Sequence, residues 1–183
     1  MRPAQATDPI STDRLTLTPI GIDDADDLMQ LYSEPLVAYW TGPWTPDAVK
    51  TWASNMAARW ARDGVGKWMA HDRIDDVLVG RGGLSRVDLE GEEVLELGWV
   101  VRDGMTGRGY ATEIGQAGLR WAAAFFPGVP VVSFTEVHNR ASLAVMRRLG
   151  LRDCGVIHRE GLIEGRPGLH RDAPFALYRS LQP

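Results

Sequence analysis

The feature that most constrains this chain is a glycine-rich turn between a β-branched apolar run and a helix. Residues 100–113 read Val-Val-Arg-Asp-Gly-Met-Thr-Gly-Arg-Gly-Tyr-Ala-Thr-Glu, with three glycines within six residues. Glycine lets a backbone turn sharply and expose its N–H groups. The helix that follows adds unpaired N–H groups and the positive end of its dipole. The stretch therefore predicts an anion site of the kind that binds a phosphate or pyrophosphate.

The composition predicts one globular domain, residues 1–183, with residues 1–12 as a loose N-terminal tail. Hydrophobic residues make up 44% and charged residues 24%, which is typical of soluble proteins. A formal net charge of −4 gives no basic field for nucleic acid. No apolar run has the length of a signal peptide or membrane span, so we expect a cytoplasmic protein with no membrane contact. The single cysteine, Cys154, excludes an internal disulfide and a thiolate metal cluster, and no metal site is predicted.

Apolar periodicity, capping residues and turn residues predict an α/β (α+β) fold. We expect a mixed, mostly antiparallel sheet of about seven strands flanked by about four helices. The predicted strands are 14–20, 67–71, 77–84, 94–101, 129–137, 156–158 and 174–178. The predicted helices are 23–34, 46–64, 109–126 and 139–150, with an aromatic loop at 39–44 and a glycine- and arginine-rich loop at 161–172.

Spacing separates two well-known phosphate loops from this one. The outer glycines have the separation of a P-loop, but Tyr110 and Ala111 stand where lysine and a hydroxyl residue belong. Gly107 and Gly109 begin a dinucleotide fingerprint, but Thr112 occupies the position of its third glycine. Neither loop fits the residues.

A third kind of loop fits. Residues 107–113, Gly-Arg-Gly-Tyr-Ala-Thr-Glu, resemble the acetyl-coenzyme A loop of GNAT-type N-acetyltransferases. Residues 137–151 resemble that family's second motif, an Asn-x-x-Ser segment followed by a Gly-containing helix end. Residues 12–28, with Thr-Asp-Arg-Leu-Thr-Leu and an acidic helix start, resemble the RimJ/RimL branch. The resemblance spans roughly residues 12 to 180, and its motifs occur in the correct order.

The resemblance implies direct acetyl transfer from acetyl-CoA to an amine, without an acyl-enzyme. Backbone groups of Val100 and Val101 would bind the pantetheine arm and polarise the thioester. The resemblance implies that Asn139 bonds the pantetheine, whereas the residue taken by itself is better interpreted as a plain helix N-cap. The loop residues that would bind the pyrophosphate are Gly107, Arg108, Gly109, Tyr110, Ala111 and Thr112.

The catalytic residues follow less directly. Many relatives have a tyrosine seven residues after the asparagine, where this chain has Met146, which cannot donate a proton. We therefore interpret Ser142, which would also contact the coenzyme, as a hydrogen-bond donor to the sulfur or a relay through water. Glu96, on the strand face opposite its neighbouring leucines, is the predicted base, and a solvent-facing carboxylate is the alternative interpretation. Glu136 and His138 are further candidates for the base.

The sequence leaves the acceptor open. A protein N-terminus is one hypothesis, a small-molecule amine is another, and a non-catalytic acyl-CoA-binding sensor is the third. By family analogy, Tyr39, Trp40 and Trp44 would border the acceptor groove. The acidic chain slightly favours a cationic acceptor, and the apolar C-terminal strands are compatible with a homodimer.

Overall fold

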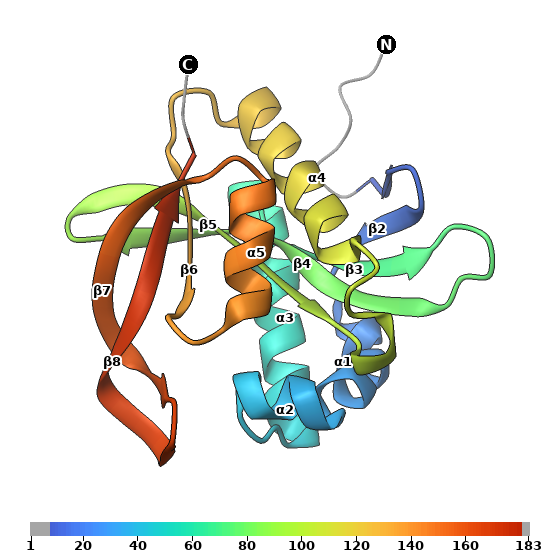
Figure 1. Ribbon diagram of the computed structural model, residues 1–183. Helices are drawn as coiled ribbons and strands as arrows, with labels where there is room; N and C mark the ends of the chain where they lie inside the picture. Colours follow the sequence, from blue (N-terminus) through green and yellow to red (C-terminus); the bar gives the residue numbers. More distant parts are fainter. Residues whose placement is uncertain (1–7, 181–183) are drawn as a thin grey trace.

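The computed structural model describes residues 8–180 (Figure 1). It contains five α-helices, two short 3₁₀ helices and eight strands within those residues. The helices are η1 (Ile22–Asp24), α1 (Ala25–Tyr32), α2 (Pro35–Thr41), α3 (Pro46–Asp63), η2 (Asp103–Met105), α4 (Tyr110–Phe125) and α5 (Arg140–Arg148). The strands are β1 (Ile10–Ser11), β2 (Leu15–Pro19), β3 (Lys67–Asp72), β4 (Leu78–Leu89), β5 (Glu92–Val101), β6 (Val131–Glu136), β7 (Arg152–Ile163) and β8 (Arg166–Arg179).

The strands form one sheet in the order β1-β2-β3-β4-β5-β6-β8-β7. Neighbouring strands are antiparallel except β5 and β6, which are parallel. The β5–β6 register covers two residue pairs, Leu95 with Val131 and Glu96 with Val132. Beyond these pairs the two strands diverge (Figure 1), while β5 stays paired with β4 as far as Val101. One edge of β5 is thereby left open in the middle of the sheet.

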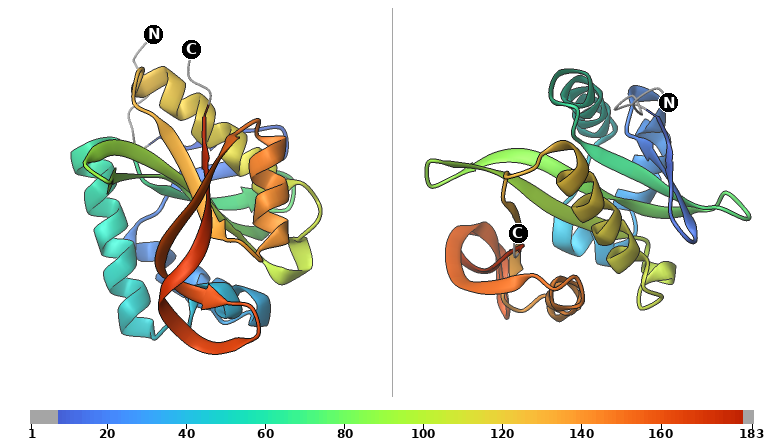
Figure 2. Two further views of the ribbon diagram at one scale, coloured as in Figure 1. Left: turned by 60° about the vertical axis from the view of Figure 1, so that its left-hand side comes forward. Right: turned by 90° about the horizontal axis from the view of Figure 1, so that it is seen from above.

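Helices cover both faces of the sheet. Figure 2 shows α4 and α5 on one face and α3 on the other. The approach of α4 depends on Gly118, because a Cβ there would lie 2.5 Å from Cδ1 of Leu97. Side chains alternate along a strand, so Arg81 and Ser85 of β4, opposite Val100 and Glu96 of β5, point away from α4. One face of these strands therefore packs apolar side chains such as Leu97 against α4, and the other carries polar and charged side chains.

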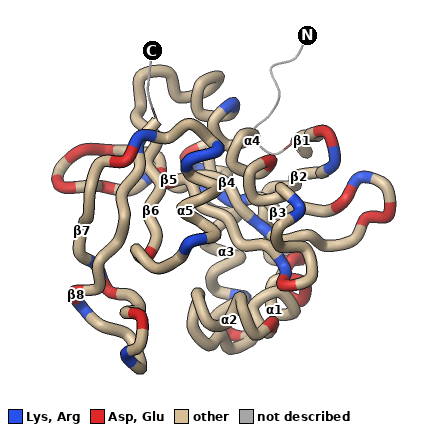
Figure 3. Tube along the Cα trace, viewed as in Figure 1, with Lys and Arg blue, Asp and Glu red and all other residues tan. Residues whose placement is uncertain are grey.

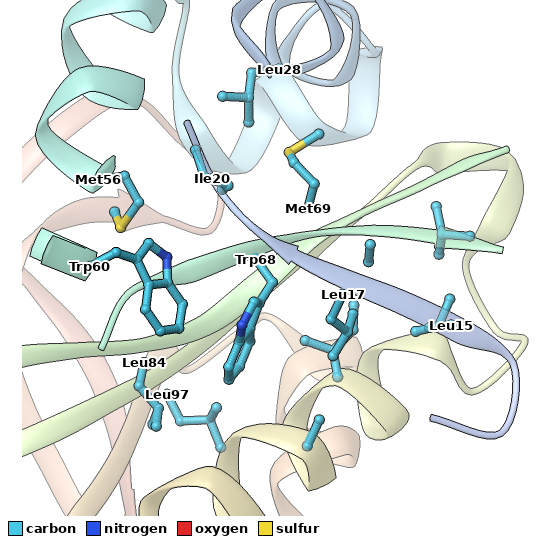
Figure 4. Packing of buried hydrophobic residues seen from close by; sticks show 14 of the residues in the cluster. Leu15, Leu17, Ile20, Leu28, Met56, Trp60, Trp68, Met69, Leu84 and Leu97 are labelled. Atoms are coloured by element: carbon cyan, nitrogen blue, oxygen red, sulfur yellow. The ribbon is translucent and has the colours of Figure 1, made fainter. Parts of the chain in front are cut away.

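Tryptophans join the layers at one side of the core. Trp68 of β3 is fully buried, and its ring centroid lies 5.4 Å from that of Trp60 and 5.7 Å from that of Trp121. Figure 4 shows Trp60 and Trp68 side by side above Leu84 and Leu97. Buried aromatic rings contribute a large share of the apolar area in a core of this size. This packing holds α3 and α4 against the strands that carry the site.

The predicted α/β fold is confirmed, and three segments differ from the prediction. Residues 39–44 were expected to form an aromatic loop, but residues 39–41 belong to α2, which begins with Pro35. Residues 161–172 were expected to form a loop, but they are strand arms that meet at a tight turn after Ile163. Ile10–Ser11, placed by the sequence in the tail, pairs with β2, and residues 1–7 lie outside the described range. No helix among the described residues has the length and apolar character needed to span a membrane.

Candidate active site

A cleft of about 660 Å³ lies at the end of β5, bordered by α2 and by the first turns of α4 and α5. It brings together two motifs that are separated in sequence by about thirty residues. Arg108 is not among its lining residues, and its backbone carbonyl accepts a hydrogen bond from Arg14 Nη1 at 2.9 Å. The predicted coenzyme-binding residues that line the cleft are Val100, Val101, Gly107, Gly109, Tyr110, Ala111, Thr112, Asn139 and Ser142.

The N-terminus of α4 presents hydrogen-bond donors to this cleft. Gly109 is the N-cap residue with φ +85°, and no side chain caps the helix there. The N–H groups of residues 110–112 therefore have no acceptor within the helix. The buried Oγ1 of Thr112 also has no hydrogen-bond partner among the described residues. Together with the helix dipole, these donors make the turn suited to an anionic ligand.

An ion-pair network attaches this turn to the start of β2. The Thr12 hydroxyl donates to Glu113 Oε1 at 2.5 Å, and Arg14 Nε donates to Oε2 at 2.7 Å. The Arg14 guanidinium also lies 4.4 Å from the ring centroid of Tyr110. Burial acts to raise the pKa of the Glu113 carboxyl, but these hydrogen bonds and the Arg14 charge outweigh it and hold the pKa below its usual value. We assigned no role to Arg14 or Glu113 from the sequence. They could have been noticed only because Arg14 lies in the segment 12–28 and Glu113 in the loop 107–113, both of which resemble the family.

A second cavity of about 400 Å³ adjoins the first. It lies between β4 and β5 on one side and β6 on the other, and α3 also contributes to its lining. The residues that line both cavities are Trp40, Thr41, Trp99, Val100, Asn139 and Ser142. Two ligands bound in these cavities would therefore meet beside Val100 and Ser142.

The start of α5 lies at this junction. The Asn139 side chain caps the helix, because its Oδ1 accepts a hydrogen bond from the Ser142 N–H at 3.1 Å. The Asn139 amide N–H groups are left for a ligand. The Ser142 hydroxyl has no hydrogen-bond partner within residues 8–180, whereas Met146 is buried against Leu151 and Tyr178. Thr41 also lines both cavities, but its hydroxyl donates to the Val37 carbonyl at 3.0 Å, so Ser142 carries the hydroxyl that is left for a ligand at the junction.

Glu96 lies in the second cavity as half of an ion pair. Its Oε2 accepts a hydrogen bond from Lys67 Nζ at 2.7 Å, and Nζ also donates to the Gly83 carbonyl at 2.9 Å. Lys67 is 5% exposed, and this burial lowers the pKa of its ammonium group, while Glu96 opposes the shift. Gly98 leaves room for the pair, since a Cβ there would lie 2.6 Å from Glu96 Oε1. The solvent-facing interpretation of Glu96 does not describe this position.

Glu136 and His138 differ in their positions. Glu136 lines the second cavity, is 9% exposed and has no cationic partner among the described residues. Its carboxylate accepts two long hydrogen bonds, from the Leu162 N–H to Oε1 and from the Thr135 hydroxyl to Oε2, both at 3.5 Å. His138 lines neither cavity, and its ring centroid lies 5.2 Å from that of Trp40. Of these two candidates, Glu136 is the one that lines a cavity.

The three aromatic residues predicted for the acceptor groove are in different places. Trp40 lines both cavities. Tyr39 is 51% exposed and its ring packs edge-on against Trp40 at 4.7 Å. Trp44 stacks on the buried ring of Tyr32 at 4.6 Å and lines neither cavity. Only Trp40 of the three is brought to the site in the described structure.

Known proteins with similar sequences and structures identify the family. Residues 14–152 match the family described as "Acetyltransferase (GNAT) domain". A Bacillus subtilis (strain 168) protein named "Uncharacterized protein YkkB" is 24% identical over 142 residues, which are 76% of this chain and 83% of that protein.

Two solved structures have a similar fold over nearly the whole chain. The acetyltransferase from Agrobacterium tumefaciens str. C58 is 26% identical, has a TM-score of 0.71, and is matched over 96% of this chain and 95% of its own. RimL, a ribosomal L7/L12 alpha-N-protein acetyltransferase solved in complex with coenzyme A, is 14% identical, with a TM-score of 0.78 over 96% of this chain and 98% of its own. Because the family match covers most of the sequence and the fold agrees with it, the chain belongs to the GNAT family of acetyltransferases.

Proposed function

We propose that the protein moves the acetyl group of acetyl-CoA directly to a primary amine, and that the first cleft takes the coenzyme while the second takes the amine. The observation that supports this division is the junction of the two cavities at Val100 and Ser142. An acyl-enzyme intermediate is not needed in such an arrangement, because both reactants reach the same point. Cys154 is exposed and lines neither cavity.

The first cleft fits a long coenzyme that carries phosphates and amides. Its donors at the α4 N-terminus, including the unpartnered Thr112 hydroxyl, suit the pyrophosphate. The β5 edge that faces the diverging β6 offers backbone N–H and C=O groups near Val100 and Val101 for the pantetheine amides. Asn139 adds its side-chain N–H groups as further donors to the pantetheine amides.

Residues at the junction and in the second cavity supply the remaining requirements for transfer. Acetyl-CoA supplies a thioester carbonyl as the electrophile. Glu136 accepts a proton from the incoming ammonium, so that the nitrogen becomes nucleophilic. A backbone N–H at the open edge of β5 donates to the carbonyl oxygen as charge develops there. The nitrogen then bonds to the carbonyl carbon, the carbon–sulfur bond breaks, and a second proton passes from the nitrogen to the thiolate, which leaves as coenzyme A. Ser142 donates a hydrogen bond to the sulfur as that bond breaks.

We assign the proton acceptor to Glu136 and not to Glu96 because Glu96 is already bonded to Lys67. Glu136→Gln should lower kcat/KM by about 100-fold or more, as expected for a lost general base, with an unchanged Kd for coenzyme A. Glu160→Gln, an exposed strand residue, is the control. If Glu96→Gln stays folded and alone abolishes transfer while Glu136→Gln is active, the assignment reverses.

The function is tested by acetyl-CoA-dependent thiol release across a library of primary amines, including peptides with free N-termini. Release with at least one amine, and a mass increase of one acetyl group on that amine, is the expected result. Tight coenzyme binding with no release for any amine would instead indicate the acyl-CoA sensor.

A further inference from the structure

We infer that the acceptor amine also carries a carboxylate, which Arg59 and Arg81 bind in the second cavity while Glu136 receives the amine. The inference rests on the proposed function, since it specifies which amines the second cavity takes. The observations that support the inference are the number, sign and pairing of the charged groups that line the second cavity.

The second cavity holds more cationic than anionic side chains. Three cations line it, Arg59 of α3, Lys67 of β3 and Arg81 of β4, against the carboxylates of Glu96 and Glu136. Lys67 and Glu96 neutralise each other through their 2.7 Å ion pair. Arg59 and Arg81 have no carboxylate partner within 4.0 Å among the described residues. Two arginines and one carboxylate are thus left to interact with a ligand.

Arg81 is held in place by aromatic residues. Its Nε donates to the Tyr32 hydroxyl at 2.7 Å, and its guanidinium carbon lies 5.1 Å from the Trp52 ring centroid and 5.5 Å from that of Tyr32. Cation–π contacts of this kind orient a guanidinium without neutralising its charge. Its terminal N–H groups have no acceptor in the described part of the chain, and a planar fork of this kind pairs with a carboxylate through two parallel hydrogen bonds.

The positive charges act on one another. Burial lowers the pKa of Lys67, Glu96 opposes that shift, and the charges of Arg81 and Arg59 lower the pKa further. The two arginines are therefore near enough to repel the Lys67 ammonium. An anion bound in this cavity offsets the positive charges, so the cavity favours a negatively charged ligand group.

Glu136 provides the opposite charge on the other side of the cavity. It lies on β6, whereas Arg81 lies on β4, and the diverging strands separate the two. Ser133 and Thr135 add hydroxyls on the Glu136 side. A ligand that satisfies both sides has an amine and a carboxylate. This local arrangement differs from the net charge of −4, and acidic residues are found instead at turns such as the β4–β5 turn (Figure 3).

The inference is tested with matched acceptors that differ only in the anionic group. One pair is a free amino acid and its carboxamide, and the other is a short peptide with Glu or Gln at its second position. The carboxylate member of at least one pair should show a kcat/KM about 10-fold or more above its partner, as expected for a charge-assisted bidentate contact. The pair with the larger ratio identifies the source, a small molecule or a peptide N-terminus.

Variants assign the preference to the arginines. Arg81→Gln and Arg59→Gln should each bring the kcat/KM ratio of the carboxylate acceptor to its neutral partner close to one, with coenzyme affinity unchanged. Arg81→Lys should retain part of the preference for the carboxylate. Arg59, at the partly exposed face of α3, provides the result if Arg81→Gln fails to fold. Arg171→Gln, an exposed arginine outside both cavities, should behave as wild type.

Direct binding separates this inference from the proposed function. Calorimetric titration of the same pairs into protein loaded with coenzyme A should show tighter binding of the carboxylate member, and Arg81→Gln should remove the difference. Equal affinities, or tighter binding of a diamine, overturn the carboxylate site even if transfer occurs. If the carboxylate member binds more tightly but no amine is acetylated, the site stands and the transfer proposal fails.

Discussion

At the scale of single residues, Gly109 combines a backbone requirement with a position in the coenzyme cleft. Its φ of +85° is accessible to glycine and strained for a β-branched residue, and Gly109 is the N-cap residue of α4. Gly109→Val should therefore displace the N–H groups of residues 110–112 and raise the Kd for coenzyme A by about 10-fold or more, which corresponds to about 1.4 kcal/mol. Isothermal titration calorimetry measures the change directly.

The opposite end of α4 offers a matched control. Gly128 has φ +84° and no heavy atom within 4 Å of a built Cβ, and it lines neither cavity. Gly128→Val should lower the free energy of unfolding by a similar amount, about 1–2 kcal/mol, and leave the Kd for coenzyme A unchanged. If both variants lose affinity equally, the effect is one of folding and the loop assignment is wrong.

Ser142 is the second residue whose role a single substitution can test. Its hydroxyl faces the junction of the cavities and has no protein partner in the described structure, while its N–H is bonded to Asn139. Ser142→Ala should therefore leave the α5 cap intact and lower kcat about 10- to 100-fold, with the Kd for coenzyme A near wild type. Ser54→Ala, an exposed site on α3, is the control. Unchanged turnover would make Ser142 a helix residue with no chemical role.

At the scale of elements, α2 forms one wall of the coenzyme cleft and is tied to the end of β5. Glu34 accepts hydrogen bonds from Arg102 Nε and, at 2.6 Å, from the Asp103 N–H. Asp103 Oδ2 in turn accepts from the Leu36 N–H at 3.0 Å. This reciprocal link holds the helix that carries Trp40 beside the glycine turn.

Glu34→Gln should loosen α2 without unfolding the sheet. We expect a several-fold rise in KM for acetyl-CoA, because a charged hydrogen-bond acceptor is worth about 1.5–3 kcal/mol and here it orders one wall of the cleft. Amide hydrogen exchange of residues 36–41 should accelerate while β3 and β4 stay protected. Glu93→Gln, which removes a more exposed ion pair with Arg86 far from α2 in the sequence, should change neither quantity.

The same helix shows where sequence reasoning failed. Pro35 stops α1, but a proline after an extended residue is also a good first residue of a helix, and Glu34 has that extended conformation. The β7–β8 arms escaped prediction for a different reason. Their side chains are mostly exposed and polar, so the pairing of Gly161 with His170 depends on the local turn and not on an apolar pattern.

The glycine turn and the start of α5 were predictable because each is a local motif with a fixed spacing. The ion pair between Lys67 and Glu96 was not, since its partners are 29 positions apart and meet through β4, the strand that lies between β3 and β5. The second cavity depends on where β5 and β6 part, which no local pattern specifies. Residues from one motif can be read from the sequence, whereas a charge cluster assembled from several strands needs the fold.

At the scale of the whole molecule, one contact connects the start of the described chain to the coenzyme turn. Thr12 and Glu113 are 101 positions apart, and the Glu113 carboxylate also accepts hydrogen bonds from the backbone and side chain of Arg14. Because the carboxylate is only 11% exposed, water competes weakly for these bonds. The network contributes to global stability as well as to the position of the turn.

The pH dependence of unfolding tests this contribution. The folded-state pKa of Glu113 lies below its ordinary value of 4.5, so its stabilisation is fully present above that pH and is lost as the pH falls through the folded-state pKa. Glu113→Gln should lower the free energy of unfolding by about 1–2 kcal/mol at neutral pH, and the gap to wild type should narrow in acid. Urea denaturation monitored by tryptophan fluorescence measures the free energy of unfolding of wild type and variant at neutral and acidic pH. Glu160→Gln is the exposed control. A gap that does not change between neutral and acidic pH would show that the Glu113 charge contributes nothing to stability, because only a titrating carboxylate makes the difference depend on pH.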